Sequence, residues 1–463
     1  MNKETICAIA TAPGAGAIAV IRLSGAQAFP IADQLFRPAG KDKSLITQES
    51  HTALFGRIVE KETIVDEVVA TLFRNPHSFT GEDVVEFSCH GSTYIQQKII
   101  RLLLEAGCRM AEPGEFTRRA FANGKMDLAQ AEAVADLIAS TSAANHRLAM
   151  QQMRGGVSKE LGRLRADLLH FVSLIELELD FSEEEVEFAD RKALLERSVN
   201  LEKSLRKLTD SFRLGNAIKN GIPVAIVGET NAGKSTLLNR LLNEEKAIVS
   251  NIHGTTRDVI EDTTHIGGFT FRFIDTAGIR ETQDQIEQLG IERTYQKIEQ
   301  ASIVLWLIDA TCVNEHIEWM ANRIVPRTQN KTLMVLFNKM DKISKDEQKV
   351  LDQLFLPYTK HRLHISAKQN QNLDVLRALL LERAGLPDLH RQDVVITNLR
   401  HYEALSAALE AIQRVHQGLL DQQSGEFLSQ DLRECIHYLG QITGTITTDE
   451  VLGNIFQHFC IGK

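Results

Sequence analysis

Residues 223–242 read PVAIVGETNAGKSTLLNRLL, and this stretch decides the fold of the middle of the chain. Its apolar run at 223–227 predicts a buried strand, and the pattern at 235–242 predicts a helix. Between them G-x-x-x-x-G-K-S runs from Gly228 to Ser235, in the strand–loop–helix setting that a phosphate-binding loop requires. A chance glycine-rich turn is the alternative, and the flanking strand and helix argue against it. The residues expected at the phosphates are Asn231, Ala232, Gly233, Lys234, Ser235 and Thr236.

Each part of this loop has a chemical role. Glycines allow backbone N–H groups to close on phosphate oxygens, and the helix N-terminus adds partial positive charge. Lys234 supplies a full charge to the outer phosphates. The Ser235 hydroxyl is expected to bind Mg²⁺.

Three further motifs follow predicted strands: DTAG at 275–278, NKMD at 338–341 and SAK at 366–368. The carboxyl ends of parallel strands are where such sheets bind ligands. Asp341 can accept from guanine N1–H and N2–H, a pair that adenine does not offer, so the sequence predicts GTP rather than ATP. The motif residues expected at the nucleotide are Asp275, Thr276, Ala277, Gly278, Asn338, Lys339, Asp341, Ser366 and Ala367.

The segment GTTRD at 254–258 lies where a switch loop would give Mg²⁺ a second hydroxyl, and we expect Thr256 to supply it. An N-cap threonine in a turn is compatible with that role. Ile279 follows Gly278, where many GTPases carry a glutamine that orients water. The carboxylates that could align water instead are Glu281, Asp284 and Glu287. Arg257, Arg280 or a bound monovalent cation could supply further positive charge.

Four stretches of the chain differ in pattern. Residues 1–120 mix strands, expected at 6–10, 17–23, 66–73 and 83–88, with a helix at 92–106, which is typical of α+β structure. Residues 121–213 and 386–463 read as helical. Residues 221–385 alternate strands with helices and predict a parallel sheet covered on both faces. Helical composition on both sides suggests that this α/β domain is inserted into a helical one.

Composition excludes several classes of protein. The net charge of −9 argues against a protein that coats nucleic acid through bulk charge. Six scattered cysteines without a C-x-x-C pair indicate reduced thiols, as in the cytoplasm. No run reaches the roughly 18 apolar residues of a membrane helix, so we expect no membrane association.

Several blocks together resemble the MnmE (TrmE) family of tRNA modification GTPases, within the TrmE–Era-like P-loop GTPases. The N-terminal blocks are TAPGAGAIAVIRLSG, FTGEDVVEFSCHG and PGEFTRRAFANGKMDLAQAEAVADLI. The central blocks are NAGKSTLLN, AIVSNIHGTTRD and DTAGIRETQDQIEQLGIERT, and the sequence given ends in CIGK. The resemblance covers nearly the whole chain.

The resemblance implies a multidomain protein: an α+β folate-binding and dimerisation domain at 1–120, an all-α helical domain at 121–213 and 386–463, and an inserted α/β G domain at 221–385. It implies a homodimer and a potassium-dependent GTPase. It also implies a heterotetramer with an FAD-dependent MnmG (GidA)-like flavoprotein. Together they would add a carboxymethylaminomethyl or aminomethyl group to C5 of the wobble uridine of certain tRNAs. The carbon would come from 5-formyl- or methylene-tetrahydrofolate.

Site residues follow from the same resemblance. Glu287 would orient water, and Cys460 would lie beside the folate as a candidate nucleophile, although free cysteines are more often simply buried. K⁺ would be held by Asn231, Ser250, Ile252 and Thr255, and Mg²⁺ by Ser235 and Thr256. The switch residues at the nucleotide would be Ser250, Asn251, Ile252, His253, Gly254, Thr255 and Thr256. The folate would be bound by Arg22, Glu86, Lys125 and Lys463.

Other interpretations remain open at the sequence level. Arg22 and Glu86 could form a surface ion pair, and Lys125 could be a solvated helix residue. The G domain would equally suit a GTPase switch for ribosome or RNA assembly without modification chemistry. A folate enzyme regulated by an inserted GTPase is a third possibility. The N-terminal folate residues and the CIGK ending favour the modification enzyme.

Overall fold

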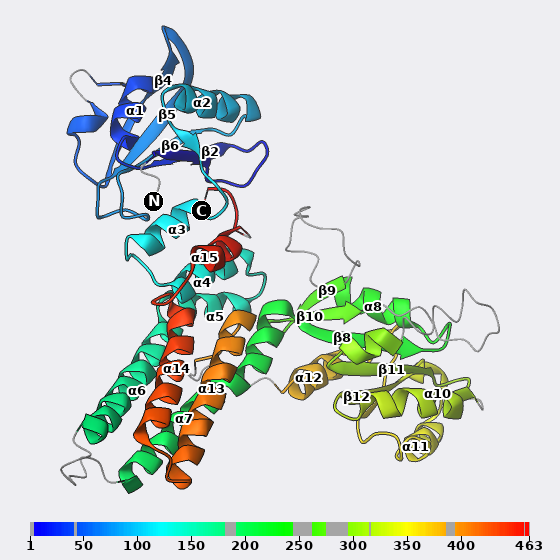
Figure 1. Ribbon diagram of the computed structural model, residues 1–463. Helices are drawn as coiled ribbons and strands as arrows, with labels where there is room; N and C mark the ends of the chain where they lie inside the picture. Colours follow the sequence, from blue (N-terminus) through cyan, green and yellow to red (C-terminus); the bar gives the residue numbers. More distant parts are fainter. Residues whose placement is uncertain are drawn as a thin grey trace, which may run out of the picture. The chain divides into compact units, whose positions relative to one another are not determined.

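The computed structural model describes residues 4–40, 44–180, 191–243, 262–274, 295–313, 316–385, 394–457 and 459–462. Contacts divide the chain into two compact units (Figure 1). The first unit comprises residues 1–139, 149–206 and 403–463, and the second unit comprises residues 140–148 and 207–402. Among the described helices, none combines the length and the apolar character needed to cross a membrane.

The first unit contains a seven-stranded sheet in the order β3-β4-β5-β6-β2-β1-β7. Neighbouring strands are antiparallel, except that β1 and β7 run parallel. The strands expected at 6–10, 17–23, 66–73 and 83–88 are confirmed with small shifts of their ends. The strands are β1 Ile6–Ile9, β2 Ile18–Ser24, β3 Phe36–Pro38, β4 Thr52–Glu60, β5 Thr63–Phe73, β6 Val84–His90 and β7 Arg109–Met110.

Helices cover one face of this sheet, and the core lies between them. α1 (Ala28–Leu35) and α2 (Thr93–Glu105) pack their apolar sides onto the strands, in one cluster with Ile21 and Phe87. The helix expected at 92–106 is α2. A smaller cluster, which includes Ile6 and Ala8, packs against the helix α3 (Glu115–Ala122).

Helices make up the described parts of 121–213 and most of those of 386–463, as the sequence predicts. In α6, Leu161, Leu164 and Leu168 recur at helical spacing and are buried. They lie on a helix that packs against α14 (Figure 1). The helices are α4 Leu128–Ala139, α5 Ala143–Met153, α6 Gly156–Asp180, α7 Arg191–Asn220, α13 Leu399–Leu420, α14 Gly425–Thr443 and α15 Asp449–Phe456.

The second unit contains a six-stranded sheet in the order β13-β12-β11-β8-β10-β9. Successive residues of β8 belong to two different hydrophobic clusters. One cluster contains Val224 and Ile226 and the other contains Ala225 and Val227, so both faces of the sheet are covered. The strands are β8 Ile222–Gly228, β9 Asp262–Ile266, β10 Phe269–Ile274, β11 Ile303–Asp309, β12 Thr332–Asn338 and β13 Arg362–His364. The helices are α8 Lys234–Asn243, α10 His316–Ile324, α11 Lys345–Leu354 and α12 Leu373–Arg383.

The prediction of a parallel sheet is confirmed for five of the six strands, and the edge strand β9 differs. Five strands are parallel, but β9 pairs antiparallel with β10. Only two glycines, Gly267 and Gly268, separate these strands, and both have positive φ. So short a loop permits only a hairpin, because a parallel connection needs a crossover of a dozen or more residues.

Candidate functional site

The phosphate-binding loop joins β8 to α8, as predicted. Asn231 and Gly233 have φ of 65° and 99°, so the loop turns through left-handed backbone. A Cβ atom at Gly233 would lie 2.3 Å from Asn338 Nδ2, which excludes any larger residue at this position without rearrangement. The glycine is therefore required both by the backbone turn and by the close approach of a second motif.

Lys234 begins α8 and folds back over the loop. Its Nζ donates to the carbonyl oxygens of Gly228 at 2.9 Å and Glu229 at 2.8 Å. The neighbouring Ser235 and Thr236 are exposed in the first turn of α8. The loop thus presents an ammonium group, two hydroxyls and a helix N-terminus together, which is the donor set that a phosphate needs.

Asn338 connects the loop to the base-recognition segments. It ends β12 and is 3% exposed. Its Nδ2 donates to the Ala232 carbonyl at 2.8 Å, and its Oδ1 accepts from the Ala367 N–H at 3.0 Å. One amide therefore joins three motifs that are far apart in the sequence, and the structure brings them together as predicted.

Lys339 and Asp341 follow Asn338 directly. Lys339 has φ of 66° and its ammonium group pairs with Asp309, at the end of β11. Burial opposes ionisation of Asp309, but hydrogen bonds from Lys339 and from Thr311 hold the pKa of this carboxyl below its ordinary value. Asp309 was not among the predicted site residues, although its place at the carboxyl end of a buried strand could have indicated it.

Asp341 is exposed at the rim of the site, so its carboxylate is accessible to a base. Gln369 Nε2 donates to Asp341 Oδ2 at 3.4 Å. The Gln369 backbone N–H donates to Ser366 Oγ at 3.3 Å, and Ser366 itself is buried. Gln369 was likewise not predicted, because nothing in its local sequence pattern indicates a contact with the NKMD motif.

Many of the expected nucleotide and cation residues lie outside the described residues. They are Ser250, Asn251, Ile252, His253, Gly254, Thr255, Thr256, Asp275, Thr276, Ala277, Gly278 and Glu287. Lys463 of the expected folate site lies outside them too.

A second candidate site lies on the sheet of the first unit. Arg22 and Glu86 are directly opposite each other on β2 and β6, and Arg22 Nε donates to Glu86 Oε1 at 2.7 Å. Arg22 Nη1 also donates to the Gly462 carbonyl at 3.4 Å. The two residues therefore form the ion pair that the alternative interpretation expects, and their side chains are partly buried, at 16% and 23% exposed. The guanidinium lies 5.6 Å from the ring centroids of both Phe79 and Phe116, which explains the partial burial.

Lys125 reaches the same region through one loop. It is exposed, as the alternative of a solvated residue expects, but it lies in the loop after α3 rather than on a helix. The helix ends at Ala122, and the turn that follows contains Gly124 with φ of 68°. Lys125 Nζ donates to the Pro76 carbonyl at 2.9 Å. Pro76 lies three residues before Phe79, whose ring contacts the Arg22 guanidinium. The segment from Pro76 to Phe79 therefore contacts both Lys125 and Arg22.

Cys460 is exposed, and its carbonyl accepts from the Gly114 N–H at 3.4 Å. Gly114 has φ of 67°, and a Cβ there would lie 2.8 Å from the Phe456 carbonyl. The end of the described chain is thus held against the start of α3 by backbone contacts. All six cysteines are free thiols, which confirms the prediction made from their scattered positions in the sequence.

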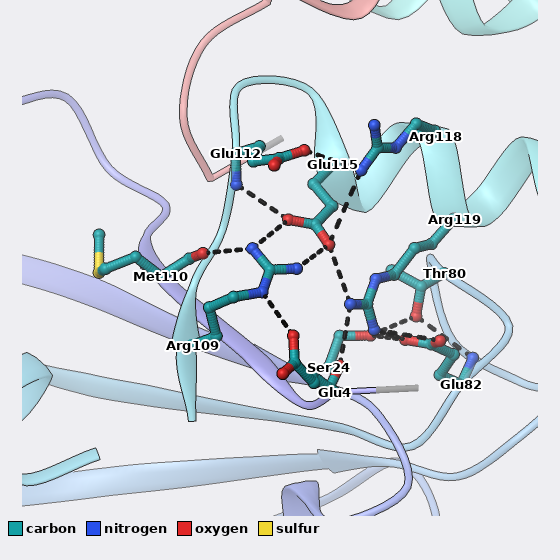
Figure 2. Close-up of polar contacts among 10 residues, drawn as sticks. All are labelled: Glu4, Ser24, Thr80, Glu82, Arg109, Met110, Glu112, Glu115, Arg118 and Arg119. Carbon is teal, nitrogen blue, oxygen red and sulfur yellow. Dashed lines mark hydrogen bonds and ion pairs between the residues drawn. The ribbon is translucent and has the colours of Figure 1, made fainter. Parts of the chain in front are cut away.

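The start of α3 carries a buried ion network (Figure 2). Glu115 is 2% exposed and pairs with Arg109 at 2.6 Å and Arg119 at 2.9 Å. Arg119 also reaches Glu82 at 3.1 Å, and Glu82 accepts from Ser24 Oγ at 2.7 Å. The network therefore ties α3 to the end of β2, two residues beyond Arg22.

The network favours ionisation of Glu115. Burial alone would raise its pKa, but hydrogen bonds from Arg109, the Glu112 N–H and Arg119 hold the pKa below its ordinary value. The pKa of Arg109 is raised in turn, mainly by its hydrogen bond to Glu115. The network is therefore a structural element beside the second candidate site.

Comparisons with known proteins give matches along nearly the whole chain. The family described as MnmE helical domain matches residues 128–460, and the family described as GTP-binding protein TrmE N-terminus matches residues 5–125. The tRNA modification GTPase MnmE of Bacteroides thetaiotaomicron is 59% identical over 466 residues, with all of both chains covered. The protein of the same description from Porphyromonas gingivalis is 50% identical over 468 residues, covering 100% of this chain and 98% of its own.

A solved structure of an Aquifex aeolicus Era variant bound to GDP.AlF4- is 33% identical. It covers 41% of this chain and 66% of its own, with a TM-score of 0.30. The full-length relatives and the two family matches are decisive. The chain therefore belongs to the MnmE family of tRNA modification GTPases and is a GTP hydrolase.

Proposed function

We propose that this chain is a potassium-dependent GTPase that works with an MnmG (GidA)-like flavoprotein carrying FAD. Together they add a carboxymethylaminomethyl or aminomethyl group to C5 of the wobble uridine of certain tRNAs, using 5-formyl- or methylene-tetrahydrofolate. The observation that carries the proposal is that one chain holds both a guanine-nucleotide pocket centred on Asn338 and a separate polar site at Arg22 and Glu86. A simple GTPase switch has no need of the second site.

The residues of the nucleotide pocket fit GTP and its cations. Lys234 Nζ donates to two backbone carbonyls of the loop, and a phosphate would offer it a stronger charge-assisted contact. Ser235 and Thr256 would bind Mg²⁺, and Asn231, Ser250, Ile252 and Thr255 would bind K⁺. When bound, these cations supply positive charge to the phosphate oxygens. Glu287 would accept a hydrogen bond from the attacking water and orient it toward the γ-phosphate.

The second site fits a folate. Arg22 is positioned by Glu86 and flanked by two phenylalanine rings, which suits a flat ligand with a carboxylate. Glu86 can accept from pterin N–H groups, and Lys125 and Lys463 would add charge toward the glutamate tail. Cys460 would lie beside the bound folate, exposed at the end of the chain.

The assembly proposed is a homodimer joined through the domain at 1–120, in a heterotetramer with the flavoprotein, acting on tRNA in the cytoplasm. The proposed domains are 1–120, 121–213, 221–385 and 386–463, with the G domain inserted. The net charge of −9 supports a partner that presents much of the tRNA-binding surface.

The first test is steady-state GTP hydrolysis in K⁺ and in Na⁺ at equal ionic strength. We expect K⁺ to accelerate hydrolysis strongly, and Glu287→Ala to abolish that acceleration while GDP binding is kept. Glu281→Ala, six residues away on the same segment, is the matched control and should retain the activity. Equal rates of GTP hydrolysis in the two salts would show that Asn231 does not form part of a K⁺ site.

The second test addresses the folate. Calorimetric titration with 5-formyltetrahydrofolate should give binding that Arg22→Gln and Glu86→Gln each weaken at least tenfold. Arg57→Gln is the matched control, because Arg57 pairs with Glu67 at 3.1 Å on the same sheet but is exposed. Unchanged binding in the Arg22 and Glu86 variants would leave the GTPase switch as the better interpretation.

A further inference from the structure

A carboxylate at the end of β11 is joined to the segment expected to recognise the base. Asp309 is the last residue of β11 and lies directly opposite Asn338, the last residue of β12. The Ala310 N–H donates to the Asn338 carbonyl at 3.0 Å, so the backbone remains paired just beyond the two strands. The Asp309 side chain therefore starts from a fixed backbone position beside the NKMD motif.

The two carboxylate oxygens of Asp309 have different partners. Oδ1 accepts from the Thr311 N–H at 3.0 Å and from Thr311 Oγ1 at 2.7 Å. Oδ2 accepts from the ammonium group of Lys339. Because the first oxygen is held by the loop that follows β11, the direction of the second oxygen is fixed. Asp309 is thus an anchor whose own position does not depend on Lys339.

The backbone of Lys339 adopts an uncommon conformation. Its φ is 66°, in the left-handed region, which is unfavourable for a residue with a side chain and is concentrated at functional sites. The Lys342 N–H donates to the Lys339 carbonyl at 2.9 Å, and the Met340 N–H donates to the Ile365 carbonyl at 3.1 Å. Among the described residues, Asp309 is the carboxylate that pairs with the Lys339 side chain. Both the backbone and the side chain of this lysine are therefore held.

Stability alone does not account for the ion pair. The side chains of Asp309 and Lys339 are 17% and 31% exposed, so both charges lose part of their hydration. Burial opposes the ionisation of Asp309, but hydrogen bonds from Lys339 and Thr311 outweigh it and hold the pKa of this carboxyl below its ordinary value. Apolar side chains of similar size are often as stabilising as a buried pair. The pair is better explained by its effect on the position of Lys339.

A tethered ammonium group orders the whole Lys339 side chain. A lysine has a long apolar stem with several rotatable bonds, and an untethered stem must lose that freedom when a ligand covers it. The stem of Lys339 runs from the NKMD motif to the end of β11, at the edge of the sheet where the strand ends meet. Asp341 lies two residues further along the chain, with its carboxylate exposed.

We propose that Asp309 is a positioning residue for the guanine base, because it tethers Lys339 and so presents the ordered apolar stem of this lysine to the face of the base. This role rests on the placement of the base at Asp341 in the function proposed above. Asp309 does not touch the nucleotide and acts through Lys339. Its loss should therefore weaken ligands that contain the base and spare ligands that consist only of phosphate.

The experiment compares the affinities of the full chain for GDP and for inorganic pyrophosphate, both with Mg²⁺, by calorimetry. The test variant is Asp309→Asn. The matched control is Asp346→Asn, whose carboxylate pairs with Lys349 at 3.0 Å on the exposed surface of α11. Lys339→Gln and the double variant with Asp309→Asn complete a double-mutant cycle. Asp341→Asn measures, in the same assay, whether the base binds at the NKMD motif.

We expect Asp309→Asn to weaken GDP binding about tenfold, because ordering one long side chain on binding costs about that factor. Pyrophosphate binding should change less than twofold, and Asp346→Asn should leave both ligands unaffected. The double variant should bind GDP as Lys339→Gln does, because Asp309 acts through that lysine. The proposal is overturned by a GDP affinity within twofold of the wild type in Asp309→Asn, by an equal loss for both ligands, or by additive losses in the cycle.

Asp341→Asn separates the role of Asp309 from the placement of the base. A loss of GDP affinity in Asp341→Asn without one in Asp309→Asn overturns the role of Asp309 alone, whereas no loss in either variant overturns the base site as well. Thermal unfolding checks that each variant is folded. If Asp309→Asn is not, Thr311→Val replaces it, because it removes one hydrogen bond to the carboxylate at an exposed position. This variant should weaken GDP binding about threefold and leave pyrophosphate binding unchanged.

Discussion

Replacing Glu115 by glutamine should loosen the start of α3. Glu115 is almost fully buried and pairs with Arg109 at 2.6 Å and Arg119 at 2.9 Å. Removing one partner of a buried ion pair typically costs 3–5 kcal/mol, because it leaves charge buried without compensation. Both arginines keep another carboxylate, Arg109 with Glu4 at 3.0 Å and Arg119 with Glu82 at 3.1 Å. We therefore expect the lower end of that range, about 3 kcal/mol.

Hydrogen exchange followed by mass spectrometry measures this loss locally. Each 1.4 kcal/mol is a factor of ten, so the amides of α3 should exchange roughly a hundredfold faster in Glu115→Gln. The control is Glu67→Gln, whose exposed partner Arg57 makes the pair worth less than about 1 kcal/mol. Exchange of α3 within threefold of the wild-type rate would refute the idea that this network holds the helix in place.

The pH dependence of the same variant tests the charge state. The folded-state pKa of Glu115 lies below its ordinary value, so this carboxylate stabilises the fold above its unfolded pKa of about 4.3. That stability is lost as the pH falls through the folded-state pKa. The difference in unfolding free energy between wild type and Glu115→Gln should therefore be full at pH 7 and shrink below about pH 4. A difference that stays constant down to pH 3 would show that packing, and not charge, is responsible.

Three further predictions concern the nucleotide pocket and the thiols. Asp341→Asn should weaken GTP binding at least a hundredfold and improve binding of xanthosine triphosphate, because the amide no longer accepts from both guanine N–H groups. Calorimetry with both nucleotides measures this, and an equal loss of affinity for the two nucleotides would contradict it. Asn338→Ala should destabilise the second unit by about 2 kcal/mol, because the Ala232 carbonyl and the Ala367 N–H lose their hydrogen-bond partner. Unfolding followed by tryptophan fluorescence measures this loss, since both tryptophans lie in that unit. Cys312 and Cys460 are exposed and should react with Ellman's reagent in the folded chain, whereas the other four thiols are buried and should react only after denaturation. Burial also raises the pKa of Cys89 to about 11 and of Cys435 to about 12, and more than two fast-reacting thiols would contradict this prediction.

The central sheet could be predicted because its strands are continuous apolar runs. Buried parallel strands need apolar side chains on both faces, and β8, β11 and β12 have them. β9 has the sequence Asp-Thr-Thr-His-Ile and was not predicted as a strand, because only Thr264 and Ile266 are buried at this edge of the sheet. Polar edge strands carry a signal too weak to separate from a loop.

Contacts that depend on register could not be predicted from the residues alone. Arg22 and Glu86 meet because β2 and β6 pair in one particular register, and a shift by one residue would turn them to opposite faces. The role of Asp309 depends likewise on where β11 lies beside β12. Motif spacing, by contrast, identified Asn338 and Ala367, because the strand ends of an α/β sheet converge wherever the strands are in order.

The amide of Asn338 has a thermodynamic consequence for nucleotide exchange. Its two ends are committed to Ala232 and Ala367, so a rotation that frees one hydrogen bond breaks the other as well. The subsites for phosphate and base are therefore linked, and a ligand that orders one must favour ordering of the other by the same factor. Pyrophosphate and guanosine, added together, should bind with positive cooperativity although neither touches the other. Product release would then proceed by opening of the whole pocket rather than by stepwise loss of the base and then the phosphates.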